Sequence, residues 1–225
     1  SKSDGTHDQY QTCFSPWLAQ GCLSPKTIFQ ELKKVEAERG ADKSTRELFH
    51  DLVYRDFLRF MGKKYGNKIF QPGGILNQPP DPGSADKEAF NAWISGQTGC
   101  PIVDASMREL NETGFPGNRN RQIAASFLIH DLGVNWTWGA QYFESCLIDY
   151  DPCSNWVNWG LIAGVADDHT GDHKLNVAAQ SRKLDPNGDY IRQWLPELRH
   201  LSDDQIHEPY LPPQKKAGGL SALNF

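Results

Sequence analysis

Tryptophan is concentrated in one stretch of the chain, where a run of indole rings could transfer electrons. Four of the seven Trp residues fall within 24 positions, and these are Trp136, Trp138, Trp156 and Trp159. Neighbouring indole rings can pass electrons to a buried chromophore or stack on one. Aromatic residues also pack hydrophobic cores without any redox role, so the composition leaves both interpretations open.

Polar side chains recur at helical spacing in segments that are otherwise apolar. Asp51, Tyr54 and Arg55 are three and four residues apart, so they would share one stripe of a helix. Asn155 and Trp159 would share a face in the same way. Polar groups in this pattern are candidates for a functional site, although a surface ion pair or a helix cap would explain each one alone.

Two short segments gather further charged and polar groups. Asn118 and Arg121 follow Gly117 at the start of an expected helix, and Asp149 and Asp151 lie just before another. Each of these residues also fits an ordinary cap, turn or surface ion pair, so the spacing alone assigns no role.

The cysteines and histidines give no support for a metal site. The five Cys residues contain no CxxC pair, and the seven His residues form no HExxH motif. The number of Cys residues is odd and their spacing is irregular. We therefore expect free thiols in a reducing compartment and no bound metal.

Helical signals recur along the chain, whereas strand-like alternation does not. Pro25 fits the first turn of a helix that ends at Gly40. Ser44 and Glu47 form a capping-box pattern, which predicts a second helix ending before Gly66. The apolar positions of this second helix are Leu48, Leu52, Phe57, Phe60 and Met61. Further helices are expected over residues 86–94, 101–113, 118–132 (with Asn118 as its cap), 138–148, 155–163 and 189–199.

These signals predict an all-α fold in a single domain. The chain has 225 residues, and we expect a helical domain over residues 1–200 and an extended tail over residues 201–225. A net charge of −5 removes the simplest argument for DNA binding, which needs Lys and Arg. No apolar run approaches the roughly 18 residues of a membrane span. No secretory signal is visible, although a transit peptide could have been removed before residue 1.

Several segments together resemble the cryptochrome/photolyase family. The family's flavin phosphate-binding loop is similar to TCFSPWLAQGCLSP at residues 12–25. Four further segments occur in the same order as in the family. They are WISGQTGCPIVDASMREL (93–110), TGFPGNRNRQIAASFLIHDLGVNW (113–136), DYDPCSNWVNW (149–159) and LDPNGDYIRQWLPEL (184–198). The phrases NRNRQ and DYDPCSN most resemble the DASH branch of cryptochromes.

The resemblance implies a helical domain that binds FAD. Family members carry an N-terminal α/β antenna domain before this helical domain, and the present sequence matches the helical part alone. We therefore expect a fragment, a cleavage product or a shortened paralogue. The Tyr and Arg that precede the phosphate-binding loop in the family are missing here, which predicts a weakened phosphate site.

The same resemblance implies nine cofactor-binding residues: Thr12, Cys13, Phe14, Ser15, Arg55, Arg121, Asp149, Asp151 and Asn155. The turn that ends at Ser15 would offer backbone and hydroxyl donors to the pyrophosphate. Arg121 and Asp149 would form a buried ion pair beside the isoalloxazine. Asp149 and Asp151 would meet the polar edge of the ring and the ribose, and Asn155 would face flavin N5.

The residues that would face a pyrimidine dimer depart from the family's pattern. Asp51 stands where repair enzymes carry Glu, and Tyr54 stands where they carry Trp, so the carboxyl is shorter and the stacking surface smaller. Asn118 would lie on the same face, after an altered Pro-Gly pair. We interpret these changes as relaxed constraint on DNA repair, so whether the chain is an enzyme stays open.

Trp159 and Trp136 match the inner and middle members of the family's electron-transfer chain. They would supply electrons after the flavin absorbs blue light. The outer Trp would fall at position 83, which is Gly, so an electron hole would stall at Trp136 and photoreduction would be inefficient. Alternatively, Trp138 or Tyr142 replaces the outer member, or the two Trp residues are only core aromatics.

Three functions follow from the resemblance. The first is an FAD-binding blue-light flavoprotein similar to DASH cryptochromes, with DNA repair weakened or lost and nucleic-acid binding weak or absent. The second is a structural or interaction subunit, in which a protein partner covers the face left by the missing antenna domain. The third is an active photolyase fragment. A chloroplast or another organelle is the expected location, and otherwise a soluble intracellular one.

Overall fold

The computed structural model describes residues 12–78, 86–166 and 174–209, and within these ranges all regular secondary structure is helical. This confirms the predicted all-α class. The α-helices are α1 (Ser15–Ala19), α2 (Pro25–Arg39), α3 (Lys43–Tyr65), α4 (Lys87–Ile94), α5 (Pro101–Thr113), α6 (Asn118–Ser126), α7 (Trp136–Cys146), α8 (Pro152–Ile162), α9 (Val177–Leu184) and α10 (Asp189–Trp194). Shorter helical turns are η2 (Gly66–Phe70), η3 (Phe127–Asp131) and η4 (Pro196–Leu198).

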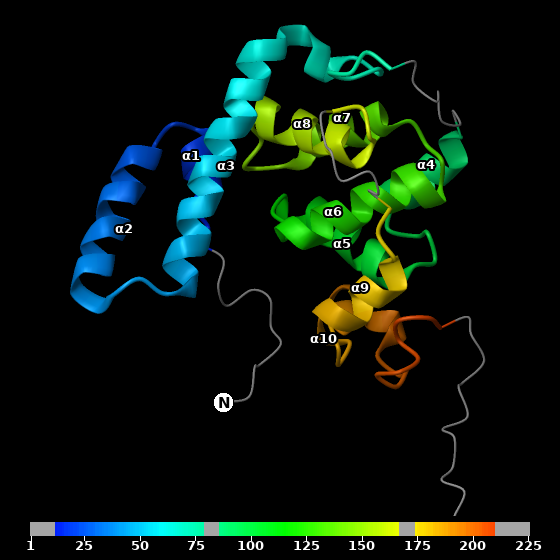
Figure 1. Cartoon of the computed structure of the whole chain (residues 1–225). Coiled ribbons are helices and arrows are strands. Elements are labelled where there is room, and N and C mark those ends of the chain that lie inside the picture. Colours follow the sequence, from blue (N-terminus) through cyan, green and yellow to red (C-terminus); the bar gives the residue numbers. More distant parts are fainter. Residues whose placement is uncertain (1–11, 79–85, 167–173, 210–225) are drawn as a thin grey trace, which may run out of the picture.

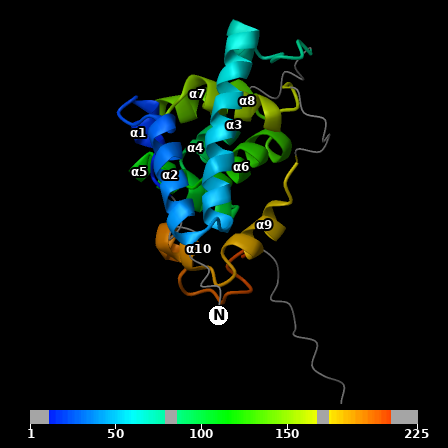
Figure 2. The same cartoon turned by 60° about the vertical axis from the view of Figure 1, so that its left-hand side comes forward.

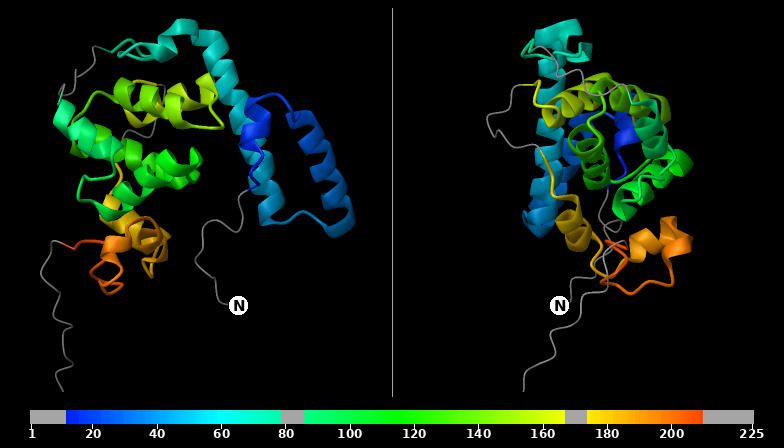
Figure 3. Two further views of the ribbon diagram at one scale, coloured as in Figure 1. Left: turned by 180° about the vertical axis from the view of Figure 1, so that it is seen from behind. Right: turned by 90° about the vertical axis from the view of Figure 1, so that its right-hand side faces the viewer.

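The long helix α3 joins two parts of the molecule. It packs against α2 over its first half and along α8 farther on. The hairpin of α2 and α3 projects to one side of the other helices in Figure 1 and in the rear view of Figure 3, and in Figure 2 it is turned toward the viewer. On the other side, α7 packs against α8, and α5 packs against both α6 and α10.

The core lies among α4 to α8 and α10. Helix α5 is buried along most of its length, including Val103 and Met107, which are fully shielded from solvent. Trp93 of α4 is also fully buried, and its indole Nε1 donates a hydrogen bond to the carbonyl of Ala124 at 3.0 Å. A buried indole N–H needs such a partner, so this bond fixes α4 against α6.

The start of α3 differs from the prediction. Asp42, rather than Ser44, caps the helix: its carboxylate accepts from the backbone N–H of Thr45 at 2.8 Å. Thr45 accepts in return from the backbone N–H of Asp42, so the capping box is formed by this pair and not by Ser44 with Glu47. Asp serves as a cap as well as Ser does, and the chain enters the helix two residues earlier than expected.

The buried stripe of α3 also differs from the expected one. Leu52 and Met61 are buried as predicted, together with Leu58, which the sequence analysis passed over. Phe57 and Phe60 are 46% and 69% exposed. The reason is that α3 meets α2 and α8 along Leu52, Leu58 and Met61, so the two Phe side chains project elsewhere.

Other predicted helices are present with shifted boundaries: α7 and α8 begin two and three residues earlier than expected, and the helix expected over residues 189–199 ends at Trp194 and is followed by the short turn η4. Asn118 does not cap α6, because Gly117 occupies the cap position and no side chain caps this helix. The expected continuation to residue 132 passes through the π-helical turn η3. The helix that the resemblance implies after the phosphate-binding loop is α1, whereas α9 was not predicted. Helix α9 begins with the side chain of Asn176 accepting from the N–H of Ala179.

The predicted domain end at residue 200 falls inside packed structure. Ile206 is fully buried in the core and His207 is nearly so. The His207 ring is hydrogen-bonded to the hydroxyl of Ser181 at 2.7 Å, which attaches this segment to α9. The remainder of the predicted tail, residues 210–225, lies outside the described residues. In the part of the chain that is described, no helix is long and apolar enough to cross a membrane.

We predict that Gly139→Ala destabilises the domain, whereas Gly160→Ala does not. A methyl group on Gly139 would overlap the Trp159 ring and Leu128, while one on Gly160 would make ordinary contacts from 3.5 Å outward. Overpacking of this kind costs about 1–3 kcal/mol, and removing a helical glycine elsewhere gains up to about 1 kcal/mol. Urea unfolding followed by circular dichroism measures both, and equal stabilities would contradict the prediction.

Candidate functional site

A bidentate ion pair joins α6 to the turn before α8. The two terminal nitrogens of Arg121 each donate to one oxygen of Asp149, both at 3.0 Å, and its Nε donates to the carbonyl of Pro116 at 2.8 Å. The side chain of Asp149 is only 5% exposed and that of Arg121 22%. The planar guanidinium matches a carboxylate at two points. The predicted ion pair is therefore present, and its role toward a cofactor stays a prediction.

Asp151 ties α3 to α8. Asp151 caps α8: its Oδ1 accepts from the backbone N–H and the hydroxyl of Ser154. Its Oδ2 accepts from Arg59 of α3 at 2.8 Å. Burial by itself raises the pKa of Asp151, but the hydrogen bonds from Ser154 and Arg59 outweigh it and hold the pKa below its usual value. The carboxylate is thus ionised at neutral pH.

Asn155 is buried between α7 and α8. Its amide nitrogen donates to the carbonyl of Ala140 at 2.9 Å. This bond uses one end of the amide and fixes the orientation of the side chain, one turn along α8 from Asp151. Asn155 therefore lies near the two acidic residues, as the resemblance implies.

Helix α1 and the turn before it lie beside α3. Arg55 is largely buried, and its guanidinium donates to the carbonyl of Leu18 at 3.4 Å. In the turn, Thr12 and Cys13 are exposed, Cys13 has a positive φ of 51°, and no side chain caps α1. Phe14 and Ser15 complete the turn at the start of α1. Arg55 thus contacts α1, the helix that follows the predicted phosphate-binding turn.

The three residues of the predicted substrate face lie on two helices. Tyr54 donates its hydroxyl to Asn158 of α8 at 2.9 Å, and its ring is stacked with that of His50. Asp51 is exposed on the same helix, but neighbouring protein atoms partly desolvate its carboxyl and raise its pKa. Asn118 is exposed at the start of α6. The hydroxyl of Tyr54 is therefore already hydrogen-bonded to a residue of α8.

Trp159 and Trp136 are buried but have different ring neighbours. Trp159 packs against Phe143 at 5.1 Å and Trp93 at 6.2 Å between ring centroids. Trp136 packs against Trp156 at 5.8 Å and donates its Nε1 to the carbonyl of Pro72. The two indoles thus belong to two aromatic groups. Position 83, where the outer Trp was expected, lies outside the described residues.

Three residues of this region were missed in the sequence. Arg59 pairs with Asp151, Asn158 accepts from Tyr54, and Trp93 contacts Trp159. A local signal existed for two of them, because Arg59 is four residues after Arg55 and Asn158 three after Asn155, so each shares a helix face with a predicted residue. For Trp93, no signal pointed to Trp159.

No group of three His, Cys, Asp or Glu side chains that could hold a metal occurs in residues 12–78, 86–166 and 174–209. His169 and His173 are four residues apart, a spacing that two metal-binding His residues can have. Both lie outside the described residues.

The donor set fits a flavin dinucleotide. Arg55 and Arg59 supply positive charge on α3, as an anionic pyrophosphate requires. The nearly buried carboxylate of Asp149 and the buried amide of Asn155 are polar groups of the kind that the edge of a flavin ring requires.

We predict that Asp151→Ala destabilises the protein at neutral pH, because α8 loses its cap and Arg59 loses its partner. Loss of such a cap costs about 0.5–2 kcal/mol. Asp151→Asn keeps the capping oxygen and costs less. Since the folded-state pKa is lowered, this stabilisation is present above the unfolded pKa of about 3.9 and disappears as the pH falls through the folded value. Urea unfolding of the three proteins between neutral and acidic pH measures this difference in the free energy of unfolding. If the wild type remained more stable than Asp151→Asn in acid, the prediction would be wrong.

Comparison with known proteins gives a consistent result. Residues 45–223 match the family described as the FAD binding domain of DNA photolyase. Cryptochrome DASH of Synechocystis is 54% identical over 202 residues, which cover 90% of this chain and 41% of that protein. Cryptochrome DASH, chloroplastic/mitochondrial, of Solanum lycopersicum is 46% identical over 207 residues, covering 91% and 36%. The crystal structure of a Synechocystis cryptochrome aligns with a TM-score of 0.86 at 55% identity, over 89% of this chain and 41% of that one.

These matches confirm the family inferred from the motifs, and the description of the family confirms FAD as the expected cofactor. The chain spans only 41% and 36% of the two relatives' lengths, so their whole activities do not transfer to it directly. The similarity extends through the segments that hold Arg121, Asp149, Asp151 and Asn155. The chain belongs to the family of FAD-binding domains of DNA photolyases and is similar in sequence and fold to DASH cryptochromes.

Proposed function

We propose that this chain is an FAD-binding blue-light flavoprotein domain similar to DASH cryptochromes, in which repair of pyrimidine dimers is weakened or lost. The observation that carries the proposal is the bidentate Arg121–Asp149 pair, held next to Asp151 and Asn155. FAD supplies light absorption and one-electron chemistry when it is bound. The protein supplies orientation and electrostatics.

The ion pair gives the site an acceptor in a fixed position. Arg121 holds both oxygens of Asp149, so this nearly buried carboxylate is matched by a cation. In surroundings that exclude water, such a group interacts more strongly with a polar ring edge than it would in solvent. Asn155, fixed by Ala140, presents an amide at a constant orientation.

Asp151 has room for one further partner. A carboxylate has about four lone-pair sites, and Ser154 and Arg59 use three of them. The remaining site on Oδ2 suits a hydroxyl donor such as that of a ribose. Arg55, Arg59 and the turn over residues 12–15 would then serve the pyrophosphate.

We predict that the protein binds FAD, but at least tenfold more weakly than full-length DASH relatives do. The resemblance implies that one charge-assisted phosphate contact is lost, and such a loss costs about 1.5–3 kcal/mol. Titration of apoprotein with FAD, followed by fluorescence quenching, measures this. Arg121→Lys, which keeps the charge but loses the planar fork, should weaken binding further. Affinity equal to that of the relatives, or no binding, would show that the prediction is wrong.

Weakened repair follows from the groups on α3. A dimer must leave the duplex at a cost of a few kcal/mol, which contacts in the pocket must offset. Asp51 is one methylene shorter than Glu, and the hydroxyl of Tyr54 is already bonded to Asn158. The net charge of −5 also weakens the attraction to phosphates.

We predict that dimer repair in duplex DNA is undetectable or very slow. Reduced, FAD-loaded protein is illuminated with an irradiated duplex, and the remaining dimers are counted. The double variant Asp51→Glu with Tyr54→Trp should raise the rate, provided that both proteins carry equal FAD. Repair by the wild type at the rate of an active photolyase would refute the proposed loss.

A second candidate function is that of an interaction subunit. Large apolar side chains are exposed on the projecting hairpin of α2 and α3, including Phe49, Val53, Phe57 and Phe60. Contiguous exposed apolar groups are typical of surfaces that another protein covers. The visible absorption spectrum of the purified protein separates the two functions, since a flavin spectrum supports the first and its absence the second. An organellar location, as in the name of the tomato relative, stays a prediction.

A further inference from the structure

Trp159 belongs to an aromatic cluster that leads away from Trp136. Its ring centroid lies 6.2 Å from that of Trp93, with the planes at 77°, and Trp93 lies 6.0 Å from Tyr142, at 65°. Trp93 is fully buried, and its hydrogen bond to Ala124 fixes the ring. Three readily oxidised rings in consecutive contact therefore run from α8 through α4 to α7.

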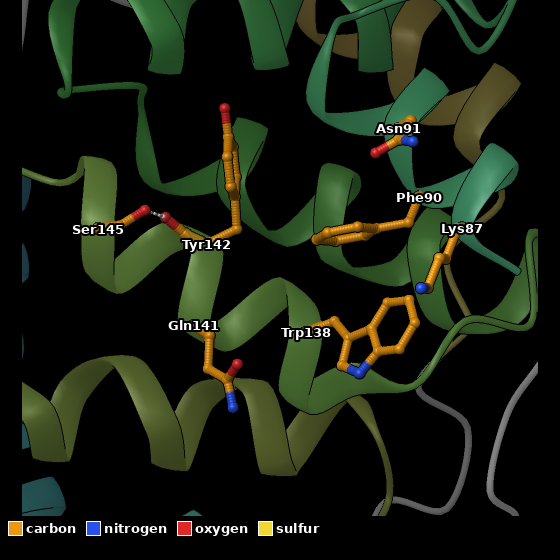
Figure 4. A pocket seen from close by; sticks show the side chains of 7 residues that line it. All are labelled: Lys87, Phe90, Asn91, Trp138, Gln141, Tyr142 and Ser145. Carbon is orange, nitrogen blue, oxygen red and sulfur yellow. Dashed lines mark hydrogen bonds between the residues drawn. The ribbon is translucent and has the colours of Figure 1, made fainter. Parts of the chain in front are cut away.

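This cluster ends at an open pocket between α4 and α7. The pocket has a volume of about 480 Å³, and the rings of Phe90, Trp138 and Tyr142 stand around it (Figure 4). Tyr142 is half-buried, and its hydroxyl donates to the side-chain oxygen of Asn111 at 2.6 Å. One end of the cluster is thus buried beside Asn155, and the other is accessible from solvent.

We propose that Trp159, Trp93 and Tyr142 form an electron-transfer route from the pocket between α4 and α7 to the flavin end of α8. The proposal rests on the proposed function, which supplies the oxidant, a photoexcited flavin. When FAD is bound and photoexcited, Trp159 would be the residue that supplies it with one electron. Trp93 would then reduce the oxidised Trp159, and Tyr142 would reduce Trp93. The phenol proton of Tyr142, which is hydrogen-bonded to Asn111, would leave to solvent. An external thiol then returns one electron and one proton to the tyrosyl radical.

Tyr142 is a better terminus than Trp138. Trp138 contacts Phe90 at 5.3 Å, and Phe90 contacts Trp93 at 5.9 Å. A tryptophanyl radical does not oxidise a phenylalanine ring, so Phe90 offers no intermediate step between Trp93 and Trp138. Tyr142, in contrast, contacts Trp93 directly. Burial, followed by the neighbouring Cys146 thiol, raises the pKa of Tyr142 to about 12, so the phenol is neutral at pH 7 and must release a proton on oxidation.

The competing route starts from Trp136. Its ring contacts Trp156, which in turn contacts the exposed Phe70 at 5.2 Å. Trp156 also interacts with the hydroxyl of Tyr150, whose pKa burial raises to about 12 as well. Tyr150 is therefore the matched control for Tyr142, because both are half-buried phenols beside a buried Trp, at the ends of different clusters.

The first test needs no flavin. Azidyl radicals, made by pulse radiolysis, oxidise Trp side chains of the apoprotein, and the conversion of tryptophanyl into tyrosyl radicals is followed by absorption. We expect Tyr142→Phe and Trp93→Phe to lose a conversion phase that Tyr150→Phe retains. Circular dichroism checks the fold of each variant. Since Tyr142 is at the surface, its variant remains informative if Trp93→Phe does not fold. An unchanged phase in Tyr142→Phe would overturn the route.

The second test uses FAD-loaded protein and a blue flash, with electron paramagnetic resonance as the readout. We expect a tyrosyl signal that disappears in Tyr142→Phe and persists in Tyr150→Phe and Trp138→Phe. Loss of the signal in Tyr150→Phe instead would overturn the route in favour of the Trp136 cluster. If the protein binds no FAD, the proposed function fails. The radiolysis experiment still decides whether electrons pass between the three rings.

Discussion

The two carboxylates in the turn before α8 hold the helices of the site in place. Asp149 accepts both terminal nitrogens of Arg121 from α6, while Asp151 accepts Arg59 from α3 and caps α8 with its other oxygen. Removing a cation from a largely buried pair leaves an uncompensated charge, which is costly. The relative positions of α3, α6 and α8 therefore depend on this short turn.

Small residues allow these helices to approach closely enough for the electrostatic contacts to form. Gly139 of α7 faces the Trp159 ring, and Gly62 of α3 faces the sulfur of Cys153 on α8. A side chain at either position would have to displace a packed neighbour. The same close contact holds Trp159 between Phe143 and Trp93, so the packing that stabilises α7 against α8 also determines which aromatic rings touch.

The buried and the projecting parts of the molecule are built differently. Most residues of α5 and about half of those of α8 are buried, and the buried polar groups of Ser106 and Asn155 are hydrogen-bonded. On the α2–α3 hairpin, Phe57 and Phe60 remain exposed, and Tyr54 is directed toward α8 by Asn158. The residues that we propose for FAD binding on α6 and α8 are therefore separate from the exposed face of α3.

The sequence by itself determined the helical class, most helix positions and the family. The helix positions depend on local signals: Pro25 and Gly40 bound one helix, and Gly114 ends another with a positive φ. Such signals act over a few residues, so they can be read without the fold. The family, and with it the expected ion pair of Arg121 and Asp149, came from the resemblance of longer motifs.

Only the tertiary structure decided which of these residues meet. Nothing in the sequence around Arg59 indicates its partner, which is Asp151 at the start of α8. In the same way, the sequence does not show that Leu58 is buried and Phe57 exposed, because the packing of α2 and α8 against α3 decides it. The contact of Trp93 with Trp159 spans 66 positions, and it exists because α4 and α8 pack into the same core. Contacts between distant segments depend on the packing of whole helices, which no local pattern of residues specifies.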